Sequence, residues 1–241
     1  MLKFFLISIR PHNPPIDKLN AAQSRGKVED LSQQVDYLVT QGRKEEGIDF
    51  DKDWKILNIL IGGNNLFDCH LPESHPDVFE KRMNETLSKI YEKIPRVFVN
   101  LFNIFEDGLM DTWNNGKDVT YCSRFWKVIS FAIPCMVKSD ELRQKMVQYS
   151  KEYNVRMSNL AKWWNNKREK KDFFIAVQPV LQHTRLPDLS YSSKFDCFHP
   201  SLKSNAELSI TIWNSLQLPW DKKPRSSMKE FLCPNENTIV Q

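Results

Sequence analysis

The chain has 241 residues, of which 34 are basic and 30 acidic, for a formal net charge of +4. These charges are spread along the sequence, so we expect no nucleic acid partner. The length suits one α/β domain with a substantial core. No apolar run of the sequence approaches the length of a membrane-spanning helix.

Residues 1–17 are interpreted as a ragged N-terminal segment of a truncated chain. The apolar run at residues 4–9 is typical of the start of a signal peptide, but it meets Arg10 after six residues and has no small-residue cleavage site. Pro14 and Pro15 then interrupt any regular structure, because neither has a backbone N–H to donate. The run at residues 2–9 has the composition of a strand.

Apolar periodicity predicts strands that alternate with helices over the rest of the chain. Such an alternation indicates a parallel sheet covered on both faces, a three-layer α/β/α sandwich, with its site outside the carboxyl ends of the strands. Residues 106–117 are polar and contain glycines, which favours an irregular insertion that forms part of a lid. We expect strands at residues 55–61, 96–102 and 173–177, and helices at residues 29–43, 76–94, 139–166 and 205–216. Of the strands, residues 55–61 form the clearest buried run.

The helix expected at residues 139–166 carries aromatic and aliphatic side chains at spacings of three and four. Two interpretations stay open. The stripe packs into the core, or it is a lipid-binding face. We favour the core, because a stripe at helical spacing is buried somewhere in most proteins.

Candidate chemistry lies in residues 195–201, Phe-Asp-Cys-Phe-His-Pro-Ser. Asp196 and His199 are three residues apart in a proline-bounded loop, so both can face one cavity, where the carboxylate orients the imidazole and the imidazole accepts a proton. A purely structural pair is the alternative. A second signal is the apolar run at residues 56–61, which ends in Gly62-Gly63-Asn64-Asn65 and brings an amide side chain to a strand's carboxyl end.

Further motifs follow in a fixed order along the chain. They are Leu-Asn-Ala-Ala at residues 19–22, Val-Glu-Asp-Leu at 28–31, Trp-Lys at 54–55, Pro-Arg-Val-Phe-Val-Asn-Leu at 95–101, the run 173–179 and Trp-Asn at 213–214. Together with the two signals above, they resemble the phospholipase B1 branch of the SGNH, or GDSL, lipases. The resemblance implies a flavodoxin-like hydrolase domain over residues 18–220, N-terminally incomplete, with its second strand at residues 18–22. Residues 221–241 are expected to be a disordered polar tail.

The resemblance also implies a function, the hydrolysis of phospholipid and lysophospholipid acyl esters by a Ser-His-Asp triad. His199 would be the general base and Asp196 the residue that orients it. The side chain of Asn64 and the backbone N–H of Gly26 would form the oxyanion hole. A membrane surface is a possible partner, and neither a metal nor a cofactor is expected.

The chain departs from the family pattern at the nucleophile. No Gly-Asp-Ser occurs in the sequence, and Ser8 lacks both that flank and the exposing turn. An ungapped alignment places Arg25 on the oxyanion glycine, with Gly26 one position late, and Asn65 stands where relatives usually have Asp. We therefore predict a hydrolase by family that lacks its nucleophile and is inactive as it stands. The alternative is a secreted non-catalytic protein that binds a lipid or another partner.

The family is largely secreted or membrane-tethered and uses disulfides. From this we expect a secreted, disulfide-bonded glycoprotein with one glycosylation sequon, Asn84-Glu85-Thr86. Phe67 stands where relatives have a cysteine. Because five cysteines cannot all pair with one another, at least one thiol is left over, and we expect it to be Cys233. The cysteines expected to pair, in an arrangement left open, are Cys69, Cys122, Cys135 and Cys197.

Overall fold

The computed structural model describes residues 16, 18–106, 120–167, 169–185 and 187–238. At its centre is a parallel sheet of three strands in the order β1-β2-β3. In the register of the sheet, Val99 pairs with Leu57 on one side and with Ile175 on the other. The strands are β1 Lys55–Ile59, β2 Val97–Phe102 and β3 Phe173–Gln178.

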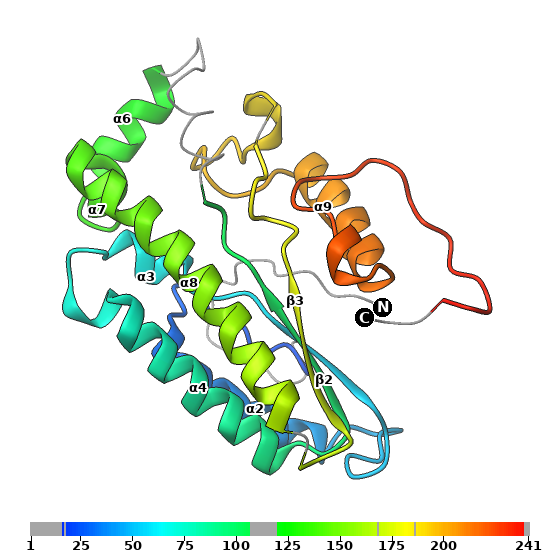
Figure 1. Ribbon diagram of the computed structural model, residues 1–241. Helices are drawn as coiled ribbons and strands as arrows, with labels where there is room; N and C mark the ends of the chain where they lie inside the picture. Colours follow the sequence, from blue (N-terminus) through cyan, green and yellow to red (C-terminus); the bar gives the residue numbers. More distant parts are fainter. Residues whose placement is uncertain (1–15, 17, 107–119, 168, 186, 239–241) are drawn as a thin grey trace.

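Helices cover both faces of the sheet, as Figure 1 shows. The helices α2, α4 and α8 pack on one face, and α9 lies on the other, so the predicted three-layer sandwich is confirmed. The long helices are α2 Leu31–Gly42, α4 Pro76–Lys93, α8 Asp140–Lys167 and α9 Leu202–Leu216. The short ones are α3 Gly63–Phe67, α6 Thr120–Val128 and α7 Pro134–Val137, with 3₁₀ turns at Val28–Asp30, Pro72–Ser74, Leu189–Tyr191 and Trp220–Lys222. Among the described helices, none combines the length and the apolar character needed to cross a membrane.

The main core lies between the sheet and the layer of α2, α4 and α8. Full burial of one large apolar side chain contributes about 1.5–3 kcal/mol, so this layer dominates the stability. The aromatic stripe of α8 packs into this core rather than facing outward, as we favoured from the sequence. Its buried members include Met146, Tyr149, Tyr153, Met157, Leu160 and Trp164.

Two expectations about strands were wrong. β1, which was expected to be the clearest buried strand, lies at an edge of the described sheet, and its Ile56 is 56% exposed. Residues 18–22 form no strand, because Lys18 takes a positive φ of 49° and the side chain of Asn20 accepts the Ala22 N–H at 3.1 Å. Local side-chain bonds of this kind compete with the pairing of a strand.

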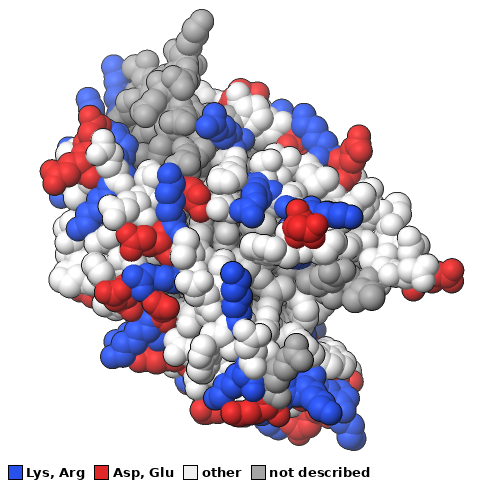
Figure 2. Space-filling model, in the orientation of Figure 1, with Lys and Arg blue, Asp and Glu red and all other residues white. Residues whose placement is uncertain are grey.

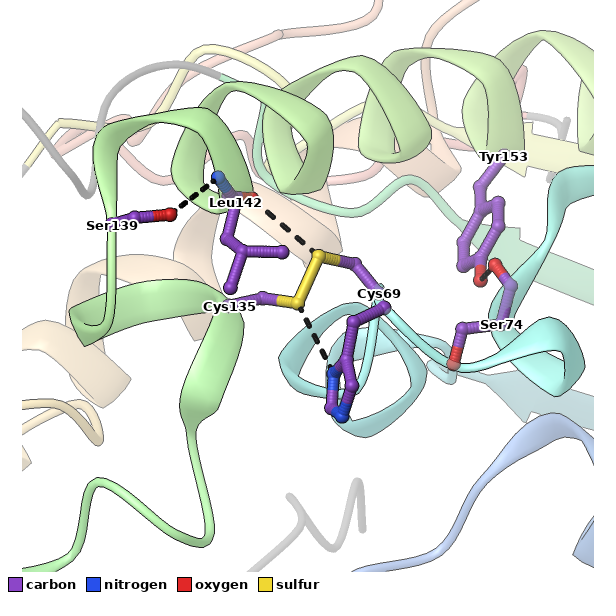
Figure 3. The surroundings of a disulfide bond; sticks show 7 residues. Cys69, Ser74, Cys135, Ser139, Leu142 and Tyr153 are labelled. Atoms are coloured by element: carbon purple, nitrogen blue, oxygen red, sulfur yellow. Dashed lines mark hydrogen bonds between the residues drawn. A yellow bond between two sulfur atoms is a disulfide. The ribbon is translucent and has the colours of Figure 1, made fainter.

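Both disulfides use the four cysteines expected to pair. Cys69–Cys135 joins the segment after α3 to α7, and Figure 3 shows it beneath the first turn of α8, where the Cys69 Sγ lies 3.4 Å from the Leu142 carbonyl oxygen. Cys122–Cys197 joins α6 to the loop of the candidate pair. Cys233 is free and exposed, as predicted.

The segment after α9 runs back along that helix. The Trp213 indole donates to the Leu232 carbonyl at 3.0 Å, and Lys223 is 7% exposed. These contacts involve part of the segment expected as a polar tail, and where the domain ends stays a prediction. The strand expected at residues 2–9 and nearly all of the insertion expected at residues 106–117 lie outside the described residues.

Candidate active site

The loop at residues 192–200 closes on itself before α9 begins. Ser192 and Pro200 form an antiparallel bridge, and the Ser193 N–H donates to the His199 carbonyl at 2.6 Å. Cys197 has a positive φ of 56°, so the chain turns between Asp196 and His199, whose side chains are hydrogen-bonded to each other. The loop therefore holds Asp196 and His199 in one fixed arrangement.

Asp196 binds both the ring and the backbone of its partner. Its Oδ2 is hydrogen-bonded to His199 Nδ1, and its Oδ1 accepts the N–H groups of Phe198 and His199, each at 3.0 Å. Partial burial opposes ionisation of this carboxyl, but the hydrogen bonds outweigh it and lower the pKa of Asp196 to about 2. The Asp196 side chain is 18% exposed and the His199 side chain 41%, so the imidazole stands in front of a shielded carboxylate.

Two contacts from α6 hold this loop from outside. One is the Cys122–Cys197 disulfide, and the other is a hydrogen bond of 2.9 Å from the Trp126 indole N–H to the Asp196 carbonyl. Sequence reasoning named the cysteines but missed Trp126. No local pattern marks it, because the two bonded residues are separated by 70 positions.

Asn64 lies in the short helix α3, directly after a turn that requires glycine. Gly62 has a φ of 107°, and a Cβ there would lie 2.5 Å from the Ile104 Cδ1. This turn directs the Asn64 side chain toward Gly26, whose carbonyl accepts the Asn64 Nδ2–H at 3.0 Å. The Gly26 N–H itself donates to the Gln23 carbonyl at 3.1 Å, inside its own turn. To serve as an oxyanion donor, the Gly26 N–H has to break its hydrogen bond to the Gln23 carbonyl.

Asn65 has a structural task in the same region. It is fully buried, its Oδ1 accepts the Val28 N–H at 3.0 Å, and its Nδ2 donates to Glu29 at 3.1 Å. These bonds connect the glycine turn to the segment that begins α2. Both polar atoms of the Asn65 amide are thus satisfied.

A cavity of about 1190 Å³ brings the two regions together. His199, Asn64 and Gly26 all line it, at the carboxyl edge of the sheet where sequence reasoning expected them. The packing of Phe198 on Phe67, with ring centroids 5.2 Å apart, connects the histidine loop to α3. From there the cavity follows β1 from Ile59 to Ile56, between α2 and the carboxyl end of α9.

The arrangement can perform proton transfer at the mouth of an apolar cavity. With Nδ1 bound to Asp196, the Nε2 of His199 is the nitrogen left to accept a proton. Ser8, which was weighed as a nucleophile, lies outside the described residues, and Ser24 is exposed in the turn before Gly26. The catalytic roles of His199, Asp196, Asn64 and Gly26 stay predictions.

Comparison with known proteins agrees with this architecture. The family model of the GDSL-like lipase/acylhydrolases matches residues 9–211. The chain is 29% identical over 252 residues to a Homo sapiens protein, "Phospholipase B1, membrane-associated", covering 98% of this chain and 17% of the relative. The Rattus norvegicus protein of the same name is 29% identical over 240 residues, covering 92% of this chain and 16% of the relative.

The corresponding Mus musculus protein is 28% identical over 220 residues, with 87% of this chain and 14% of the relative covered. The chain thus spans less than a fifth of the length of each of these relatives. No solved structure matches the chain. The family match over most of the sequence, together with the relatives along nearly its whole length, assigns the fold and its branch. This chain therefore belongs to the GDSL-like lipase/acylhydrolase family, in its phospholipase B1-like branch.

Proposed function

We propose that the chain carries the acid–base half and the ligand cavity of an acyl-ester hydrolase whose substrates are phospholipid or lysophospholipid esters. The observation that carries the proposal is the Asp196–His199 pair opening on a cavity that Asn64 and Gly26 also line. We further propose that these 241 residues do not turn such esters over, because the sequence has no Gly-Asp-Ser block. Losing a triad nucleophile typically costs about a million-fold in turnover.

In this scheme each residue has a separate task. Asp196 fixes the imidazole of His199 through Nδ1 and stabilises the imidazolium that forms when Nε2 accepts a proton. The Asn64 amide has a second N–H besides the one given to Gly26, and this N–H is the oxyanion donor of the proposal. The Gly26 N–H joins it only after the turn at Gln23 opens.

The choice of lipid rests on the cavity walls and on the names of the relatives. Most of the residues that line the cavity are apolar, as an acyl chain requires. All three relatives are named as membrane-associated phospholipases. Basic and acidic side chains are intermingled on the face in Figure 2, which favours a lipid over a nucleic acid as the partner.

A membrane surface is proposed as the place where the substrate is met. Near the candidate pair, Val128, Phe131 and Phe195 are each about three-quarters exposed. Phe195 contacts Phe125 of α6 with centroids 6.1 Å apart, so both segments face the same region. Exposed basic side chains accompany them at Arg124, Lys127 and Lys194. Exposed aromatics flanked by basic residues suit the headgroup region of a bilayer.

The second candidate function is a secreted, non-catalytic protein that binds a lipid or another partner. The two disulfides support the secreted part of this candidate function, since such bonds persist in oxidising compartments. Secretion and glycosylation at Asn84 both stay proposals. Asn84 lies in α4, where its side-chain oxygen accepts the Trp164 indole N–H at 3.0 Å.

A paired assay separates the two functions. Hydrolysis of lysophosphatidylcholine and labelling by a fluorophosphonate are measured on the purified chain beside displacement of a fluorescent fatty-acid probe. We expect probe binding without turnover or labelling. Robust turnover that disappears in His199→Ala would overturn the proposed inactivity while supporting the proposed site. Failure to bind any acyl ligand would contradict the lipid assignment in both of its forms.

A further inference from the structure

A row of amide side chains crosses the sheet on the face that carries α9. Asn58 of β1, Asn100 of β2 and Gln178 of β3 are joined edge to edge. The Asn100 Nδ2 donates to the Asn58 Oδ1 at 2.9 Å, and the Gln178 Nε2 donates to the Asn100 Oδ1 at 2.8 Å. Asn100 and Gln178 are fully buried, so this row replaces apolar packing in the middle of the sheet.

The row ends at a buried lysine from the segment after α9. The Gln178 Oε1 accepts the Lys223 Nζ at 3.0 Å and the Ser215 hydroxyl at 2.6 Å. Lys223 also donates to the Ser215 carbonyl at 2.5 Å, and burial lowers the pKa of its amine to about 8. Because burying an amine is costly, its place at the end of the row calls for an explanation.

The lysine dictates the direction of every amide in the row. An ammonium group only donates, so Gln178 has to turn its oxygen toward Lys223 and its NH₂ group toward Asn100. Asn100 then presents its oxygen to Gln178 and its NH₂ group to Asn58. Asn58 is left with its oxygen toward the sheet and its NH₂ group pointing away from it.

Asn58 is the member of the row that reaches the cavity. It is half-buried, it lies on the edge strand, and it lines the cavity that also contains His199 and Asn64. Its Nδ2 has no hydrogen-bond partner among the described residues. A chain of amides that all donate in one direction also polarises its last N–H, which makes that group a stronger donor.

We propose that the Asn58 Nδ2 binds an oxygen carried in the middle of the ligand's acyl chain, and that Lys223 is the positioning residue that holds this amide in its donating orientation. This rests on the proposed function only in placing an acyl chain in the cavity. Asn58 precedes Gly62 by four residues, or about 13 Å of extended chain, so its partner lies far from the ester carbonyl near Asn64. The ligand class is a hydroxylated or keto fatty acyl group.

The test compares two ligands in the same displacement assay, stearate and a mid-chain ketostearate, whose extra oxygen can only accept a hydrogen bond. For the intact chain we expect the keto ligand to bind about 3- to 10-fold more tightly, the range of a single hydrogen bond. Asn58→Asp keeps an oxygen for Asn100 but presents an acceptor to the ligand where the amide presents a donor. That variant should lose the preference.

Asn20→Asp is the matched control. Asn20 lines the same cavity, and a carboxylate still accepts the Ala22 N–H, so the variant adds the same charge without touching the row. It should keep the preference. If it loses the preference as fully as Asn58→Asp does, charge alone explains the result and the inference is overturned.

Two further variants test the positioning role. Lys223→Met removes the group that orients Gln178, and Gln178→Glu keeps an acceptor for Lys223 but cannot donate to Asn100. Both should reduce the preference at least 2-fold, a ratio that a general loss of affinity does not change. A full preference in Gln178→Glu would overturn the positioning role. Equal binding of both ligands by the intact chain overturns the whole inference yet leaves lipid binding standing, whereas binding of neither ligand contradicts the proposed function as well.

Discussion

The two sides of the candidate site are held in opposite ways. On the histidine side, a disulfide, an indole hydrogen bond and two backbone N–H groups fix Asp196 and leave one ring nitrogen of His199 for the ligand. On the asparagine side, the Asn64 amide donates to the Gly26 carbonyl, and the Gly26 N–H donates to the Gln23 carbonyl within the local turn. The proposed proton-transfer half is therefore assembled in advance, whereas the proposed oxyanion half gains the Gly26 N–H only after the turn at Gln23 rearranges.

Gly62→Ala should have the largest effect, because it breaks the turn that presents Asn64. The added Cβ meets the Ile104 Cδ1 at 2.5 Å and Phe79 at 3.0 Å, in a backbone conformation with φ of 107°. Strain and overpacking together should lower the free energy of unfolding by about 4 kcal/mol, measured by urea denaturation. Gly63→Ala is the control, since nothing lies within 4 Å of its added Cβ. Similar losses in both variants would show that the turn does not depend on Gly62.

Replacing Cys122 and Cys197 together by Ser should loosen the histidine side alone. Loss of a disulfide typically costs about 2–4 kcal/mol, and here it also frees the loop from α6. Hydrogen exchange should become faster at the amides of Phe198 and His199 and stay unchanged at the amides of α3. Cys233→Ser, at the free and exposed thiol, should change neither quantity. Unchanged exchange in the double variant would mean that the loop's own hydrogen bonds suffice.

Asp196→Asn sharpens the comparison through its pH dependence. The folded-state pKa of Asp196, about 2, lies below its ordinary value, so the ionised carboxylate stabilises the fold above pH 4 and this contribution is lost as the pH falls from 4 to 2. We expect the native chain to lose up to about 2 kcal/mol over that interval beyond any loss in the variant. Asp221→Asn, at an exposed position, should follow the native curve. Identical acid curves for the native chain and Asp196→Asn would contradict this.

Sequence patterns predicted the parts of the fold that depend on local periodicity. Residues 96–102 and 173–177 are apolar runs, and both became strands of the parallel sheet. The same reasoning failed for the burial of β1, because an apolar run indicates a strand but does not say how many neighbouring strands cover it. Periodicity also failed for residues 18–22, where the Asn20 side chain accepts the Ala22 N–H in place of strand pairing.

For the candidate site, spacing predicted the hydrogen-bonded pair of Asp196 and His199, and the glycine turn predicted that Asn64 would reach the same cavity. Spacing could not predict that Trp126 would bind the Asp196 carbonyl, since that contact depends on how α6 packs. The amide row was also beyond prediction. Its members lie on three strands and a distant segment, and each taken singly is an unremarkable polar residue.

The edge position of β1 has a consequence for how the protein behaves in solution. Among the described strands, β1 pairs only with β2, and both its own Ile56 and the preceding Trp54 are more than half exposed. An edge of this kind offers unpaired backbone groups beside apolar side chains, the combination that promotes growth of a sheet between molecules. Concentrated samples of these 241 residues should therefore self-associate, and Ile56→Lys should raise their solubility limit.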